Sequence, residues 1–145
     1  MRQTHIVEAA NPPSELSVLG ETVKILGQGD LSKPFEVHIQ EGEEGGGPPP
    51  HFHPWDEAFY VLEGEVEIAT NDATHRLGPG GYVHIPAGTV HAYTNKSSPT
   101  KLLAVVSDSR GGALFEALDA QAEHLPKNPE LINKIAGELD VHFTL

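Results

Sequence analysis

Apolar and polar side chains alternate over short stretches in the first two thirds of the chain. Residues 22–27 and 35–40 are rich in β-branched and aromatic residues and are bounded by Gly, Pro and Ser, which is typical of strands. The same signal returns five more times after residue 64, in EVEIAT (65–70), HRL (75–77), YVHIPAG (82–88), VHAYTN (90–95) and KLLAVVS (101–107). Many short strands separated by Gly and Pro predict an antiparallel sandwich or barrel.

The period of the apolar positions changes near the C-terminus. In residues 112–125 Leu114, Leu118 and Ala122 lie four apart, which predicts one apolar helical stripe. Farther on, Asn128, Pro129 and Glu130 have the order of an N-cap, a first-turn proline and an acidic residue at the positive end of a helix. We therefore expect two short helices that pack against the sheet.

Composition narrows the class of protein. The chain has 145 residues, which fits one domain over residues 1–145, and its net charge of -12 would repel nucleic acid and anionic lipid. It begins without a basic, apolar leader and contains no stretch long enough to span a bilayer, so we expect a cytoplasmic protein with neither kind of partner. It also lacks cysteine, so any metal site must use His, carboxylate or water.

A metal-binding pattern occurs in the segment HFHPWDEAFYVLEG, residues 51–64. His51 and His53 are two apart, so on an extended strand they share a face and lie about 6.6 Å apart. Glu57 has the same parity and would project to that side if the chain stays extended as far as the carboxylate. His91, just after a Pro and Gly turn, supplies a fourth candidate ligand.

These residues occur in two motifs that resemble those of the cupin superfamily. The first motif is a glycine, five residues, His-x-His, three residues, Glu, six residues and a glycine, and its fixed positions here are Gly45, His51, His53, Glu57 and Gly64. The second is a glycine, five residues, Pro-x-Gly, two residues, His, three residues and Asn, and its fixed positions are Gly80, Pro86, Gly88, His91 and Asn95. The glycines, proline and asparagine have a structural interpretation, because tight turns require them.

The resemblance to small single-domain cupins implies the fold and the cofactor. It implies an all-β, antiparallel jelly-roll barrel over about residues 20–107, followed by a helical extension over about residues 110–138. It also implies one divalent metal ion, which could be Fe, Mn, Ni, Co, Cu or Zn, held by His51, His53, Glu57 and His91. The tail after residue 128 resembles that of quercetinase-like, dioxygenase-type small cupins.

A small-molecule pocket should adjoin the metal. From strand parity and position, its expected lining residues are Phe35, Val37, Trp55, Phe59, Val61 and Tyr93. Trp55 has the alternative role of covering an edge at the barrel mouth. Tyr60 and Leu62 have the opposite parity, so we expect them to pack outside the barrel or to form a subunit contact.

Three functions remain open. The leading one, implied by the resemblance, is a metal-dependent dioxygenase for a small enolic or phenolic substrate, with Glu57 as both ligand and catalytic proton acceptor. Flavonol dioxygenases tend to have four residues between the second His and the Glu, whereas this chain has three, which disfavours a flavonol.

The second function is a redox-neutral isomerase, cyclase or lyase, whose base would be His38, His84 or Tyr93. The third is a non-catalytic barrel that binds a small molecule. A homodimer is expected in each case, because it would cover sheet edges.

Overall fold

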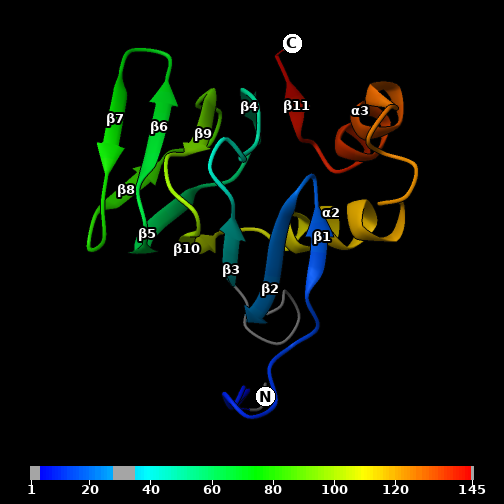
Figure 1. Cartoon of the computed structure of the whole chain (residues 1–145). Coiled ribbons are helices and arrows are strands. Elements are labelled where there is room, and N and C mark those ends of the chain that lie inside the picture. Colours follow the sequence, from blue (N-terminus) through cyan, green and yellow to red (C-terminus); the bar gives the residue numbers. More distant parts are fainter. Residues whose placement is uncertain (1–3, 28–34, 145) are drawn as a thin grey trace.

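Two antiparallel sheets form the body of the protein (Figure 1). The structure, a computed structural model, describes residues 4–27 and 35–144. One sheet has the strand order β1 (Leu16–Val18), β2 (Glu21–Gly27), β3 (Glu36–Gly42), β10 (Thr100–Val106), β5 (Glu57–Glu63) and β8 (Tyr82–Ile85). The other has the order β11 (His142–Phe143), β4 (His51–Phe52), β9 (His91–Asn95), β6 (Val66–Thr70) and β7 (Thr74–Leu77). This all-β arrangement is the predicted jelly-roll barrel.

Between the sheets, apolar side chains form one core, as the alternation along the strands predicts. Its buried members are Phe59, Val61, Val66, Ile68, Ile85, Tyr93, Leu102 and Ala104. Each expected strand is present with small shifts in its ends. The structure adds two strands that the sequence pattern did not reveal, β1 and β11, and the strand expected around His51 and His53 is the two-residue β4.

The expected helices are α2 (Arg110–Ala120) and α3 (Pro129–Glu138). The amide of Leu131 donates to Oδ1 of Asn128 at 3.0 Å, so the predicted N-cap of α3 is confirmed. The stripe predicted for α2 is shorter than expected, because the helix ends at Ala120 and Ala122 lies in the following turns. None of the helices in the described part of the chain has the length and apolar character needed to cross a membrane.

The helices extend the core beyond the barrel. Both lie on one side of the sheets, near β1 and β11 (Figure 1). A second cluster of buried apolar residues joins them to β1 and β2: Val18, Val23, Trp55, Val106, Leu114, Leu118, Leu125, Ala136 and Val141. The space between this cluster and the core of the barrel contains the candidate site.

Candidate metal centre

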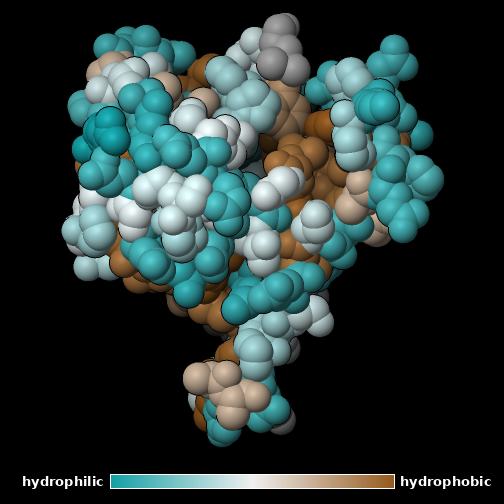
Figure 2. Space-filling view, viewed as in Figure 1, coloured by the Kyte–Doolittle hydropathy of each residue, from teal (hydrophilic) through white to brown (hydrophobic). Residues whose placement is uncertain are grey.

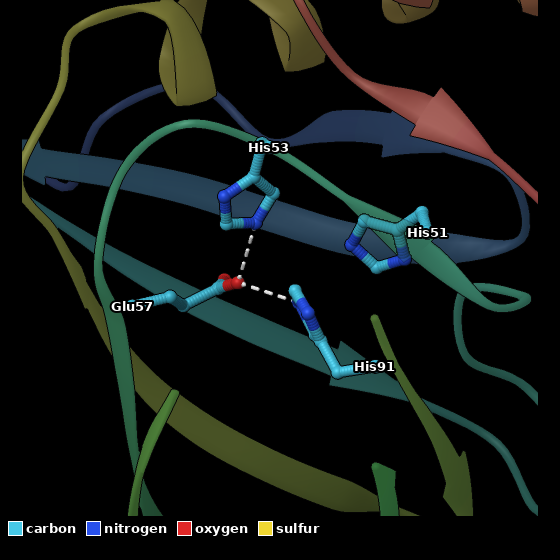
Figure 3. Close-up of side chains that lie close together, drawn as sticks. All are labelled: His51, His53, Glu57 and His91. Carbon is cyan, nitrogen blue, oxygen red and sulfur yellow. Dashed lines mark hydrogen bonds and ion pairs between the residues drawn. The ribbon is translucent and has the colours of Figure 1, made fainter. Parts of the chain in front are cut away.

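Four candidate ligands meet where the two sheets face each other. His51 is in β4 and is the register partner of His91 in β9, so both belong to one sheet. Glu57 begins β5 in the other sheet, and His53 follows β4 (Figure 3). The chain does not stay extended from His51 to Glu57, the condition on which shared parity depended, since the backbone bends at residues 54–55 and changes sheets. The bend, not shared parity on one strand, brings the carboxylate to the histidines.

The four side chains are close enough for a single ion. Nε2 of His53 and Nε2 of His91 each lie 3.1 Å from Oε2 of Glu57. One ligand atom from each of the four residues lies within 4.8 Å of the others. All four residues are buried, with exposed fractions between 2% and 9%. This grouping agrees with the ligand set expected from the two motifs.

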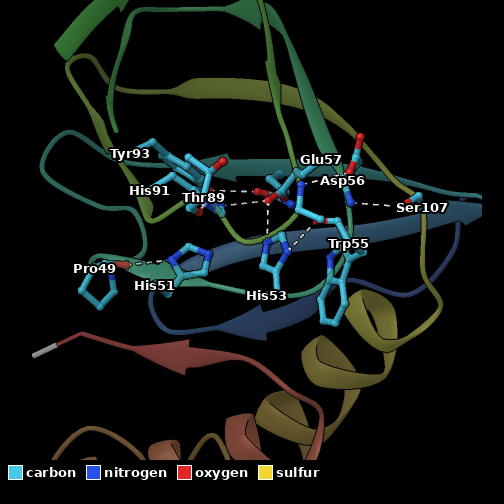
Figure 4. Close-up of polar contacts among 12 residues, drawn as sticks. Pro49, His51, His53, Trp55, Asp56, Glu57, Thr89, His91, Tyr93 and Ser107 are labelled. Atoms are coloured by element: carbon cyan, nitrogen blue, oxygen red, sulfur yellow. Dashed lines mark hydrogen bonds and ion pairs between the residues drawn. The ribbon is translucent and has the colours of Figure 1, made fainter. Parts of the chain in front are cut away.

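Backbone carbonyls fix the orientation of all three imidazole rings (Figure 4). Nδ1 of His51 lies 2.8 Å from the carbonyl oxygen of Pro49. Nδ1 of His53 lies 3.0 Å from the carbonyl oxygen of Trp55. Nδ1 of His91 lies 2.8 Å from the carbonyl oxygen of Thr89. Because a carbonyl only accepts, each Nδ1 carries the proton and donates it. The lone pair of each neutral ring is then on Nε2, the nitrogen that faces the centre.

The electrostatics of the cluster follow from burial and from this geometry. Burial and the charge of His91 lower the pKa of His51 to about 4, so its ring stays neutral near pH 7. Burial acts to raise the pKa of Glu57, but the hydrogen bonds from His53 and His91 outweigh it and hold the pKa well below the usual range. For His91 burial acts to lower the pKa, and the bond to Glu57 reverses the effect and raises it.

The donor set fits a divalent metal ion. A neutral imidazole has one N–H, and in His53 and His91 it is already directed at a backbone carbonyl. Without a cation, each ring can also donate to Glu57 only as an imidazolium. A divalent ion at this point would accept the Nε2 lone pairs and the carboxylate charge together. Three neutral imidazoles and one carboxylate suit Fe, Mn, Co, Ni, Cu or Zn and do not choose among them.

An apolar cavity of about 80 Å³ adjoins the cluster. On the face seen in Figure 2, apolar surface is visible in the hollow between the sheets and the helical segment. The lining includes the ligands His51, Glu57 and His91, the expected residues Phe59 and Tyr93, and side chains that the sequence did not suggest: Val18, Leu19, Glu21, Val23, Gln40, Pro48, Leu114, Phe115, Leu118, Val141 and Phe143. The cavity is small beside the roughly 300–1,000 Å³ typical of pockets for larger ligands.

Four expected pocket residues do not line this cavity. Phe35 precedes β3 and is 47% exposed. Val37 has the outward parity of β3, because the polar residues Glu36, His38 and Gln40 occupy the inward positions. Val61 is buried in the core between the sheets.

Trp55 is the fourth of these residues, and it packs against a candidate ligand. Its ring stacks on that of His53, with centroids 4.4 Å apart and planes at 10°, and its backbone carbonyl accepts the hydrogen bond from this histidine. The guanidinium carbon of Arg110 lies 5.2 Å from the centroid of the Trp55 ring. Trp55 therefore positions His53 through both its ring and its backbone carbonyl.

The residues expected as proton carriers in a redox-neutral enzyme are placed unequally. His38 is fully buried beside Glu36, at 3.1 Å, and does not line the cavity. His84 is exposed and pairs with Asp56 at 2.8 Å. Tyr93 lines the cavity, but burial raises the pKa of its phenol well above the usual range. Glu21 is the carboxylic acid among the cavity residues that the sequence did not suggest, although its alternation with Val23 places both on the inner face of β2.

Comparisons with known proteins agree with this fold and site. The sequence model of the Cupin domain family matches residues 35–106. Quercetin 2,3-dioxygenase of Bacillus subtilis is 35% identical over 111 residues, which are 74% of this chain and 33% of that protein. An uncharacterized protein of Aquifex aeolicus is 39% identical over 93 residues, which are 63% of this chain and 72% of the relative.

Among solved structures, the polyketide cyclase RemF of Streptomyces resistomycificus has a TM-score of 0.62 and 28% sequence identity, and the match covers 74% of this chain and 80% of that one. The chain spans only about a third of the length of the Bacillus dioxygenase, so that enzyme's activity does not transfer with the match. The matched segment contains both motifs and all four candidate ligands. The chain belongs to the cupin superfamily.

Proposed function

We propose that the protein is a metal-dependent dioxygenase that acts on a small enolic or phenolic substrate. The observation that carries this proposal is a set of three histidines, each held by a carbonyl at Nδ1, that lies together with Glu57 within reach of one ion beside an apolar cavity. The similarity to the Bacillus quercetin 2,3-dioxygenase supports the reaction class. A bound divalent ion would supply a Lewis acid for an enol oxygen and, if redox-active, a path for electrons to dioxygen.

The residues of the chain have separate tasks in this proposal. The three histidines and Glu57 hold the ion. The apolar walls, including Phe59 and Leu114, exclude water around the substrate, which strengthens the electrostatic interactions at the centre. Both hydrogen bonds to Glu57 from the described residues reach Oε2, so Oε1 is the oxygen that can take the proton of the enol. The cavity volume favours a substrate smaller than the three rings of a flavonol.

A redox-neutral enzyme is the second candidate, and two observations favour it. RemF, a polyketide cyclase, resembles the chain over most of both lengths. The cavity also contains Glu21, a carboxyl group outside the metal cluster that could move a proton. In this reaction class the ion only polarises the substrate, and dioxygen is not consumed.

The first test is elemental analysis of freshly purified, untagged protein, followed by oxygen uptake with small enols. About one equivalent of a redox-active metal per chain, with uptake that depends on the enol, would support the dioxygenase. Predominantly zinc, with enol conversion that needs no oxygen, would support the redox-neutral enzyme. No metal even after reconstitution would leave a small-molecule-binding role.

The matched control is the double variant His53→Ala, His91→Ala. It removes both hydrogen bonds to Glu57, and we expect it to lose stoichiometric metal while the barrel stays folded by circular dichroism. One tight metal ion per chain in this variant would mean that the ion binds elsewhere.

A further inference from the structure

The cavity has a second polar end, formed by Glu21 and Gln40. Glu21 begins β2 and Gln40 lies in β3, and both side chains point between the sheets with 7% and 5% of their surface exposed. Neither residue belongs to the metal cluster, although both line the cavity next to it. Most of the remaining wall is apolar, so these two residues decide which polar group of a ligand the cavity accepts.

Glu21 is held in a fixed position. Nδ2 of Asn95 donates to Oε1 of the carboxyl group at 2.8 Å. The other oxygen, Oε2, lies against Gly42, where a Cβ atom would stand only 2.0 Å away from it. The glycine leaves room for the carboxyl group, and the asparagine fixes its rotation.

Gln40 is oriented by the neighbouring tyrosine. The Tyr93 hydroxyl donates to Oε1 of Gln40 at 3.0 Å, which leaves Nε2 of the amide as a donor. No hydrogen bond from the described residues reaches Oε2 of Glu21 or uses Nε2 of Gln40. Among those residues, the one fully enclosed side-chain atom without a partner is Nδ1 of His38. The two unused atoms of Glu21 and Gln40 therefore have accessible surface.

The carboxyl group of Glu21 is costly where it lies. Burial raises its pKa, and the hydrogen bond from Asn95 offsets only part of that effect. No lysine, arginine or histidine in the described part of the chain forms an ion pair with it. A buried acid without a cation lowers stability, so its presence beside a cavity points to a role in binding.

We propose that Glu21 and Gln40 bind a hydroxyl group of the substrate, so that the substrate is an enol or phenol with a second hydroxyl group directed away from the metal. A hydroxyl group both donates and accepts, which matches an acceptor on Glu21 and a donor on Gln40. This inference rests on the proposed function, because the metal end is assigned to the first oxygen. The cavity of about 80 Å³ restricts the class to small molecules.

The test measures binding and does not depend on turnover. Phenol and the three dihydroxybenzene isomers are titrated into Zn(II)-loaded protein by calorimetry without oxygen, in the wild type and in Glu21→Gln. The glutamine can still accept from Asn95, but it presents an N–H where Oε2 was. A hydrogen bond to a charged group corresponds to a preference of about tenfold or more. Glu44→Gln, on an exposed loop residue, is the matched control.

We expect at least one isomer to bind the wild type and Glu44→Gln about tenfold more tightly than phenol does. In Glu21→Gln this preference should fall to about twofold or less. A preference that survives in Glu21→Gln, or a wild type that prefers or binds none of the isomers, would overturn the proposal. If Glu21→Gln does not fold, Gln40→Met removes the donor instead, and the preference must then be lost in that variant.

Failure of the proposed function gives a different result. Phenol affinity that is the same with and without Zn(II) would contradict the binding of the first oxygen at the metal. Absence of enol-dependent oxygen uptake would contradict the dioxygenase activity. Neither result changes how the isomer preference of Glu21→Gln is interpreted, because that preference compares two ligands on the same protein.

Discussion

Metal binding should release a proton from His91. Nδ1 of His91 faces the carbonyl oxygen of Thr89 at 2.8 Å, and Nε2 faces Oε2 of Glu57 at 3.1 Å. Only the imidazolium can donate to both. Because the bond to Glu57 raises the pKa of His91, the ring holds its second proton at pH 6, below the ordinary histidine value of about 6.5. An ion bound at Nε2 must displace that proton.

The magnitude follows from linkage. Release of this proton alone makes the apparent affinity for metal rise about tenfold per pH unit, which is about 1.4 kcal/mol per unit. His53 has the same two kinds of contact, so any proton that it releases makes the dependence steeper. His51 adds nothing near pH 6, because its pKa of about 4 leaves the ring neutral there. As the pH falls towards 4, protonation of His51 also competes with the metal, so the dependence should become steeper.

The assay is calorimetric titration with Zn(II) at pH 6 in two buffers of different ionisation enthalpy, which counts the protons released. Glu57→Gln is the informative control. It removes the carboxylate that raises the pKa of His91 and leaves burial, which lowers it, so less proton release is expected although the metal also binds more weakly. Equal release in the wild type and Glu57→Gln, or no release in the wild type, would refute the assignment of the proton to His91.

Three further predictions concern the fold and assembly. Glu36→Ala removes the acceptor for the amide of Gly112, at 2.8 Å, and the partner of buried His38. It should lower the free energy of unfolding by about 3 kcal/mol or more, measured by urea unfolding. An equal loss of stability in the exposed control Glu123→Ala would contradict this. Gly42→Ala should lower the free energy of unfolding by about 1–3 kcal/mol, because the new methyl group clashes with Glu21. In a double-mutant cycle, Glu21→Ala removes the clash, so the double variant should lose less stability than the sum of the two single variants. Additive losses would show that no clash exists. The expected homodimer should sediment at micromolar concentration with twice the chain mass of 15.6 kDa, and a species of 15.6 kDa would contradict it.

The fold and the grouping of the four candidate ligands could be predicted from the sequence because the two motifs specify local geometry. The spacing around His51 and the turn before His91 indicate the strands on which these two residues lie, and the structure brings all four candidate ligands together. The position of Glu57 was predicted for the wrong reason, since a bend and a change of sheet bring it to the site. Parity along one strand does not describe a chain that passes between two sheets.

The pocket lining was harder to predict because β3 directs its polar side chains inward. Alternation favours the apolar residues Phe35 and Val37 as the inner face. The structure places Glu36, His38 and Gln40 there instead, and Glu36 and Gln40 each take a partner from a distant segment. Gly112 of α2 donates to Glu36, and Tyr93 of β9 donates to Gln40. Those partners are known only once the fold is known, so the sequence alone cannot show that a polar face is satisfied inside.

The source of the cavity walls explains why family membership leaves the substrate open. The family match covers residues 35–106 and so includes all four candidate ligands. Much of the remaining wall lies outside that match, in residues 18–23 before it and residues 114–143 after it. The helical segment is therefore part of the site, and Glu21, at the polar end of the cavity, comes from the other unmatched region. Relatives that share the metal cluster can differ in these segments, so the substrate has to be inferred from the walls of this chain.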